Sequence, residues 1–261
     1  MRARFATFTH AMSLRTSSLA LAVSIVSILA PRADAAFHVM QIEEVIGGVN
    51  GNTSAQAIQL RLRGGGQNQV QNASLWAADA TGSNRVLVLN IASFVPNSAA
   101  GARVLLSTAA FNTGMGGTYA PDFTLATPIP SSYLSAGRLT FEDDAGTVAT
   151  PGTIYWSLAW GGAGYTGSHI GDTTNDADGN FGPAFGSALP TSSRQGVLFT
   201  GTAAAASTSN STDYAFSAIP ATVTRNDGTA FTVVPEPGTV ALVACGALLL
   251  GGSVLSRRRR Q

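Results

Sequence analysis

The sequence predicts an all-β domain, an antiparallel β-sandwich, placed between two segments that direct export. Three observations lead to this fold class. Short stretches alternate apolar and polar residues, clusters of glycine and other turn-forming residues separate them, and residues 37–234 contain no convincing amphipathic helix. Alternation with a period of two is typical of half-buried strands, and several short strands joined by such turns favour packed antiparallel sheets.

The clearest strands cover residues 56–63 and 154–160, in which every second side chain is apolar. In the second, Trp156 and Trp160 are expected to pack in the core rather than to stack on a bound sugar. Residues 85–91 are almost continuously apolar, which predicts a central strand. Further strands are expected at residues 39–46, 70–77, 138–142, 196–200 and 229–234, and a long loop at residues 203–212.

The N-terminus carries the pattern of a cleaved signal peptide, assigned to residues 1–36. Three arginines precede a short apolar stretch at residues 19–30, and Ala33 and Ala35 supply the small residues that signal peptidase accepts. Cleavage after Ala35 or Ala36 starts the mature chain near Phe37.

The C-terminus carries the pattern of a single transmembrane helix at residues 238–255. This run has 18 residues without a charge, and a helix of that length spans roughly 27 Å, close to the thickness of a bilayer core. The four arginines that follow favour the cytoplasmic side of the membrane; they are Arg257, Arg258, Arg259 and Arg260.

The tail as a whole resembles a PEP-CTERM sorting signal. Pro235, Glu236 and Pro237 precede the apolar helix, and the arginine cluster ends the chain, so the segment at residues 235–261 has all three parts in the family's order. The resemblance implies that exosortase, a membrane-embedded protease-transpeptidase, recognises these three residues. It also implies a Gram-negative bacterium, a location at the cell surface or outside the cell, and an association with exopolysaccharide and biofilm.

The charge of the exported domain argues against binding to nucleic acid. Residues 37–234 contain seven Arg, no Lys and twelve Asp or Glu, a formal charge of −5, whereas a nucleic-acid binder needs a basic surface. The only cysteine, Cys245, lies in the apolar tail. No disulfide can therefore stabilise the exported domain, and its core has to do so alone.

The start of this domain resembles a lamin-tail-like domain, which is an immunoglobulin-like β-sandwich. The similarity rests on residues 42–45, 57–60 and 75–79, and it departs from the family where Glu43 replaces Asn and Gln59 replaces Glu. The resemblance implies an immunoglobulin-like fold and a binding role rather than a reaction.

Catalytic patterns are absent from the exported domain, so the prediction is that it is not an enzyme. It has no Gly-x-Ser-x-Gly motif, only two histidines, and no phosphate-binding loop. In the first strand, alternation places Glu44 with Met40, Ile42 and Ile46 on one face. Three interpretations of Glu44 stay open: a residue at the strand rim, a structural carboxylate, or a catalytic acid.

The densest group of oxygen ligands lies at residues 172–180. Calcium takes six to eight oxygens from a flexible loop, and the candidate ligands here are Asp172, Asp176, Asp178 and Asn180. The spacing does not match an EF-hand, so an irregular calcium site and a solvated polar loop are both open. Tyr165, in the preceding glycine-rich loop, is expected to be exposed.

These patterns predict an exported structural or adhesive protein. Its expected partners are signal peptidase, exosortase, the membrane through the C-terminal helix, and exopolysaccharide. The alternative is a calcium-dependent or carbohydrate-binding adhesion domain. A polysaccharide hydrolase is a third hypothesis, and it requires a cleft with facing carboxylates that sequence spacing cannot reveal.

Overall fold

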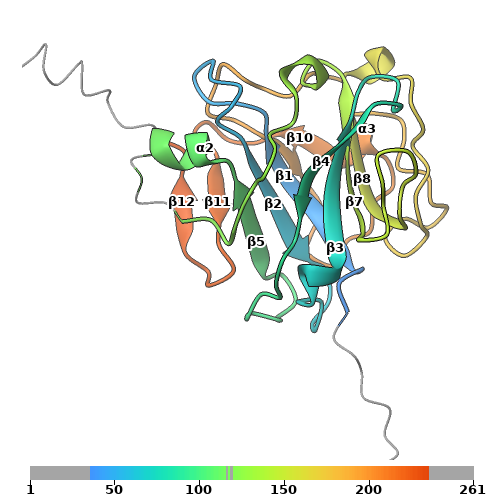
Figure 1. The fold of residues 1–261 in the computed structure, drawn as a ribbon, viewed down its shortest axis with the longest axis horizontal. Helices are drawn as coiled ribbons and strands as arrows, with labels where there is room; N and C mark the ends of the chain where they lie inside the picture. Colours follow the sequence, from blue (N-terminus) through green and yellow to red (C-terminus); the bar gives the residue numbers. More distant parts are fainter. Residues whose placement is uncertain (1–35, 116, 118–119, 235–261) are drawn as a thin grey trace, which may run out of the picture. The chain divides into compact units, whose positions relative to one another are not determined.

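The computed structural model describes residues 36–115, 117 and 120–234, which all belong to one compact unit. These residues form two larger β-sheets, a separate two-stranded hairpin and only short helices (Figure 1). The all-β prediction is confirmed. The predicted signal peptide, apart from its last residue, and the whole sorting segment at residues 235–261 lie outside the described residues. Among the described residues, no helix has the length and apolar character needed to cross a bilayer.

The larger sheet has six strands in the order β10-β9-β1-β2-β5-β6. All neighbours are antiparallel except the short parallel pair of β5 and β6. Its strands, in chain order, are β1 (Met40–Ile46), β2 (Ala57–Leu62), β5 (Arg103–Ser107), β6 (Phe123–Thr124), β9 (Val197–Phe199) and β10 (Tyr214–Phe216). The sequence patterns predicted β1, β2 and β9 but missed β5, β6 and β10.

The smaller sheet has four antiparallel strands in the order β4-β3-β7-β8. They are β3 (Ala73–Ala78), β4 (Arg85–Asn90), β7 (Gly137–Asp143) and β8 (Ile154–Trp160). All four were predicted, but the central position predicted for β4 is wrong. This strand lies at the edge of its sheet, and Leu87 is 38% exposed. The apolar run overstated the burial of this strand, because only Val88 and Leu89 are buried, and an apolar run carries no information on whether both edges of a strand are paired.

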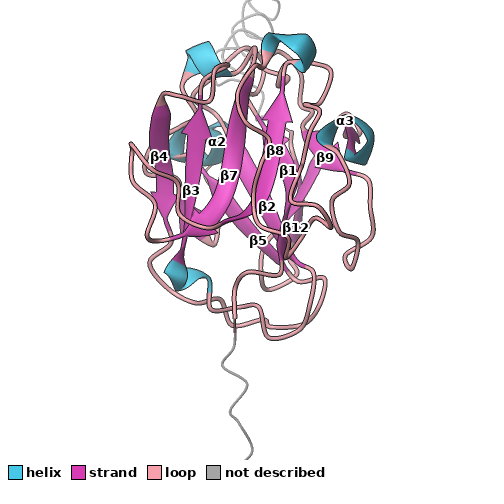
Figure 2. Cartoon of the chain, turned by 90° about the vertical axis from the view of Figure 1, so that its right-hand side faces the viewer, coloured by secondary structure: helices cyan, strands magenta, loops and turns pink. Residues whose placement is uncertain are grey.

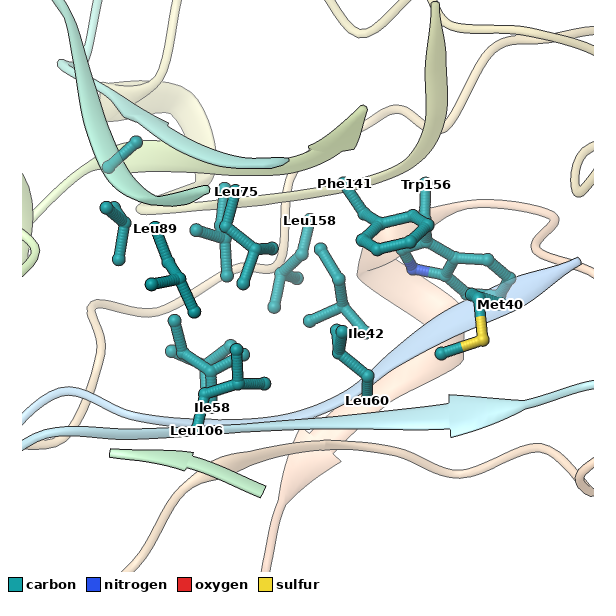
Figure 3. Close-up of a cluster of buried hydrophobic side chains, with 14 of the residues drawn as sticks. Met40, Ile42, Ile58, Leu60, Leu75, Leu89, Leu106, Phe141, Trp156 and Leu158 are labelled. Carbon is teal, nitrogen blue, oxygen red and sulfur yellow. The ribbon is translucent and has the colours of Figure 1, made fainter. Parts of the chain in front are cut away.

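The two sheets pack face to face, as Figure 2 shows from the side of the smaller sheet. Apolar side chains from both sheets fill the space between them (Figure 3). No disulfide contributes, so stability rests on this buried apolar surface. The side chains labelled in the figure are Met40, Ile42, Ile58, Leu60, Leu75, Leu89, Leu106, Phe141, Trp156 and Leu158.

A second, smaller apolar cluster covers part of the outer face of the six-stranded sheet. The hairpin of β11 (Thr222–Thr224) and β12 (Ala230–Thr232) and the short helix α2 (Ala109–Gly114) pack there. Outward side chains of the sheet, such as Ile46 and Leu105, contact Phe111 of α2 and Val223 of β11 in this cluster. The hairpin and strand β9 border a cavity over the rest of that face.

The remaining helical segments are single turns. They are α3 (Asn210–Asp213) and three 3-10 turns, η1 (Val70–Asn72), η2 (Ser131–Tyr133) and η3 (Gly162–Gly164). The α3 turn overlaps the end of residues 203–212, where the sequence predicted only a loop.

Candidate functional site

A β-bulge in β1 creates the candidate site. Gln41 and Ile42 pair with Arg61 and Leu60 of β2, but the next pair joins Glu44 to Gln59, so Glu43 has no opposite residue. The extra residue shifts the alternation by one position. Glu43 and Glu44 therefore both line a cavity on the outer face of the sheet.

The bulge makes the predicted faces of β1 wrong. Met40, Ile42 and Val45 point into the core between the sheets, whereas Ile46 belongs to the cluster under the hairpin. Glu44 does not share a face with Met40 and Ile42, and it is not a rim residue, because only 2% of it is exposed. A one-residue insertion of this kind reverses every later position on the strand.

Glu43 is a fully paired structural carboxylate. Arg103 donates to it from Nε (2.6 Å) and Nη2 (2.8 Å), Arg61 Nη1 lies 2.8 Å from Oε1, and Gln59 donates from Nε2 (2.7 Å). The register of β2 and β5 places the two arginines opposite each other. A buried ion pair is tolerated only when its charges and hydrogen bonds are satisfied in this way.

Most N–H groups of Arg61 already have a partner within the protein. Its Nε donates to the Gln41 side chain, and its Nη2 donates to the carbonyl oxygens of Gly201 and Thr202. Together with the Glu43 contact, these bonds fasten the loop after β9 to the sheet. Sequence reasoning missed this network because its members are far apart in the chain. The only local signal was the polar set of residues that alternates with the apolar residues of β2.

Glu44 differs from Glu43 because one of its oxygens is unsatisfied. Its Oε1 is buried and has no hydrogen-bond partner. Burial raises the pKa of Glu44 from 4.5 to about 7, while a hydrogen bond with the Ser217 side chain opposes this rise. Gly196 allows the close approach, since a Cβ at that position would lie 2.6 Å from Oε1. A carboxyl with a raised pKa in a cavity is a physical indication of a functional site.

The cavity has a volume of about 440 Å³. The charged groups at its base come from β1, β2 and β5, and hydroxyl groups come from Ser217, Thr222 and Thr224. Leu198 and Phe199 add apolar surface. The described lining residues include neither histidine nor cysteine, and the arginines and glutamine hold the Glu43 carboxylate. The arrangement is suited to holding a polar ligand, and it offers no second free carboxylate for hydrolysis of a glycosidic bond.

The other acidic run, residues 142–144, begins with a carboxylate that is paired within the protein. Glu142 is fully buried, and both its oxygens accept hydrogen bonds of 2.7 Å from Arg85 Nη2. The Arg85 guanidinium lies 4.5 Å from the centre of the Trp76 ring. This group ties β7 to β4 across the outer face of the smaller sheet.

The loop proposed for calcium is folded around its own carboxylates. Each predicted ligand accepts a hydrogen bond from the backbone N–H two residues later. These are Asx turns, which satisfy polar side chains locally. The acceptors are Asp172 (2.7 Å), Asp176 (3.2 Å), Asp178 (2.9 Å) and Asn180 (3.1 Å).

Asp176 alone among the four retains a buried free oxygen. It is 3% exposed, and its Oδ2 has no hydrogen-bond partner. Burial and a hydrogen bond with Asp178 raise its pKa, whereas a backbone N–H and Asp176 lower the pKa of Asp178. In the described part of the chain, no three His, Cys, Asp or Glu side chains gather closely enough to hold a metal ion. Calcium binding here would therefore depend on amide, carbonyl or water oxygens in addition.

Of the predictions about aromatic side chains, the burial of the two tryptophans is confirmed and the exposure of Tyr165 is wrong. Trp156 and Trp160 are fully buried, as predicted. Trp156 Nε1 donates to the Tyr214 hydroxyl (2.7 Å), which donates to the carbonyl of Ile42. The expected exposure of Tyr165 is wrong, because only 5% of it is exposed and its hydroxyl donates to Ser168 O (2.9 Å). The ring packs with Ala159 and Ala184 in a small apolar cluster.

Comparisons with protein-family models, curated proteins and solved structures found no match. The sorting-signal residues Pro235, Glu236 and Pro237 and the four terminal arginines lie outside the described residues. The lamin-tail-like and PEP-CTERM resemblances thus stay predictions from the sequence.

Proposed function

We propose that this chain is an exported, non-enzymatic protein of a Gram-negative cell envelope that exosortase sorts through its C-terminal tail. The β-sandwich, which we propose is immunoglobulin-like and related to lamin-tail-like domains, serves as a structural or adhesive module in contact with exopolysaccharide or biofilm material. The observation that carries the proposal is the three-part pattern of the tail: Pro235, Glu236 and Pro237, then an uncharged apolar run at residues 238–255, then a terminal arginine cluster.

The boundaries of the fold support this route. β1 begins at Met40, after the expected signal-peptidase cleavage, and β12 ends at Thr232, before Pro235. Cleavage at both places leaves every described strand intact. The absence of cysteine from residues 37–234 also means that folding after export needs no disulfide chemistry.

A substitution in the tail tests the sorting step. Glu236→Ala in the native host is expected to leave the chain unprocessed and in the inner-membrane fraction, because the proposed recognition residue is gone. Gln261→Ala, at the other end of the same tail, is the control and is expected to be processed normally. Immunoblots of fractionated cells give the size and location of each variant. Normal processing of Glu236→Ala would refute recognition by exosortase.

A calcium-dependent role is a second candidate, favoured by the unsatisfied buried oxygen of Asp176. Calcium at roughly 5 mM exceeds the dissociation constants usual for extracellular modules, and a ligand that binds only the folded state raises the melting temperature. We expect a higher melting temperature in calcium than in EDTA for the native chain and for Asp144→Asn, an exposed control. Asp176→Asn is expected to abolish the difference. Equal melting temperatures of the native chain in calcium and EDTA would exclude this role.

A further inference from the structure

Two arginines line a second hollow, a groove of about 270 Å³ between the loop before β5 and the turn of the β11–β12 hairpin. Arg103 comes from the start of β5 and Arg225 from the turn, and none of the described residues that line the groove is acidic. Asn226 joins the two sides, because its Nδ2 donates to the carbonyl of Arg103 (2.9 Å) and its Oδ1 accepts from the N–H of Asn97 (2.8 Å). The groove is therefore built by bonds between distant segments, and both guanidinium groups belong to it.

The guanidinium of Arg103 has one edge free. Its Nε and Nη2 donate to Glu43 (2.6 and 2.8 Å) along one edge, which leaves the edge between Nη1 and Nη2 without a partner among the described residues. Arginine carries five N–H donors in a fixed plane, so this second edge can hold both oxygens of another carboxylate. The side chain is 36% exposed, so a ligand can reach it. Glu43 also pairs with Arg61 and cannot cancel the charge of both arginines.

Arg225 is held only loosely by its acidic neighbours. Its Nε lies 3.9 Å from Asp122 Oδ1 and its Nη1 lies 3.4 Å from Asp227 Oδ2, whereas charge-assisted hydrogen bonds usually measure about 2.7–2.9 Å. Asp227 is exposed, and exposed ion pairs contribute little to stability. Nη2 has no partner among the described residues, and the side chain is 30% exposed. Arg225 can therefore donate to a stronger acceptor in the groove.

The charges in the groove favour an oxyanion as the ligand. Both arginines would repel a cation, and a neutral group would leave their free donors without a charged acceptor. The exported domain carries a formal charge of −5, so attraction to the domain as a whole cannot hold an anion. The groove itself therefore has to bind it.

We propose that the groove binds the carboxylate of a uronate unit in an acidic polysaccharide. Arg103 holds this group through its free edge, because a planar carboxylate matches the guanidinium fork, and Arg225 donates from the hairpin turn. Thr224 offers a hydroxyl to the sugar ring. The volume is slightly below the range usual for small-molecule sites, so one sugar unit fills the groove and the rest of the polymer stays in solvent. The oxyanion site rests on the arginines alone, whereas the choice of a saccharide rests on the proposed contact with exopolysaccharide.

The test uses the full-length chain in an uncharged detergent without a sugar headgroup. Saturation-transfer NMR and calorimetry measure the binding of methyl glucuronide, with methyl glucoside as its neutral match. Acetate and a sulfated glucose are the comparison anions. The binding assay does not involve the tail, and the Glu236→Ala test of sorting does not involve the groove, so each proposal can fail alone.

Two variants locate the bound ligand, and a third is the control. Arg225→Gln removes one of the charged donors and is expected to weaken binding of methyl glucuronide at least tenfold, the effect of losing a hydrogen bond to a charged group. Ala100→Glu places a carboxylate at an exposed position that lines the groove, and repulsion is expected to weaken binding at least as much. Arg194→Gln makes the same change of charge outside the groove, and we expect no effect.

The outcomes separate the possibilities. Methyl glucuronide that binds more tightly than the other three probes, with the expected effects of the variants, supports the uronate site. Equal binding of the two glycosides would overturn the oxyanion. Acetate that binds as tightly as methyl glucuronide would refute the saccharide, and a sulfated glucose that binds more tightly would refute the carboxylate. No binding of any probe, or binding that neither Arg225→Gln nor Ala100→Glu weakens, would overturn the site itself.

Discussion

Replacing Glu44 by glutamine should change how the stability of the protein depends on pH. The carboxyl has a pKa near 4.5 in the unfolded chain and about 7 in the folded protein, chiefly because burial disfavours its charged form. Below pH 4.5 the group is protonated in both states and carries no penalty. Between pH 4.5 and 7 the unfolded state ionises first, so the folded state loses stability as the pH rises. At 1.36 kcal/mol for each pH unit between the two values, the loss above pH 7 amounts to about 3 kcal/mol.

Urea unfolding of the native chain and of Glu44→Gln, without ligand, measures this effect. The buried amide of the variant adds its own free-energy change, but that change does not vary with pH. The difference in unfolding free energy between the two proteins should therefore shift by about 3 kcal/mol from roughly pH 4 to pH 8, in favour of the variant at high pH. Asp144→Asn, at an exposed acid, should show no comparable shift. A difference for Glu44→Gln that stays constant across this range would refute the buried, unsatisfied state assigned to Glu44.

Three substitutions test the rest of the framework. Glu142→Gln leaves the Arg85 charge buried without its counter-ion, so urea unfolding should show a loss of about 3 kcal/mol; a loss below about 1 kcal/mol would mean that the pair is solvated. Tyr214→Phe removes the acceptor of the Trp156 indole and should lower the unfolding free energy by about 1–2 kcal/mol, whereas an unchanged value would place that hydroxyl in water. Leu75→Ala opens a cavity between the sheets and should cost about 3 kcal/mol, with a visibly lower melting temperature; a neutral effect would contradict the packing of the two sheets.

The strands that could be recognised from the sequence are those in which apolar side chains line one face and polar side chains line the other. In β2, Ile58, Leu60 and Leu62 lie in the core between the sheets, whereas Gln59 and Arg61 belong to the polar network, so alternation is visible along the strand. The same holds for β8, where Trp156 and Trp160 were correctly placed in the core. Burial on one face leaves a pattern in the sequence, because the two faces meet different surroundings.

The strand β5 shows why other elements were missed. The hairpin and α2 cover its outer face, so Val104, Leu105 and Leu106 are all buried and no alternation results. A short apolar run of this kind does not distinguish a strand from other buried structure. Whether such a segment forms a strand depends on pairing and packing partners that lie far along the chain. The local sequence pattern gives no information about these partners.

The candidate site could be predicted least of all. The bulge in β1 has no sequence signature, yet it decides that Glu44 enters the cavity rather than the core. The partners of Glu43 on β2 and β5 also come from distant segments. Sequence reasoning identified Glu44 as a carboxylate that needs an explanation, but only the three-dimensional arrangement shows that one of its oxygens lacks a partner.

The most direct test of the proposed sorting route is the intact mass of the protein recovered from its native host, together with the sequence of both termini. We expect a chain that begins near Phe37 and ends between Pro235 and Gly238, with any attached group visible as added mass. A chain that still carries Arg257, Arg258, Arg259 and Arg260 would contradict this route, and the tail would then be a permanent anchor instead of a removable address.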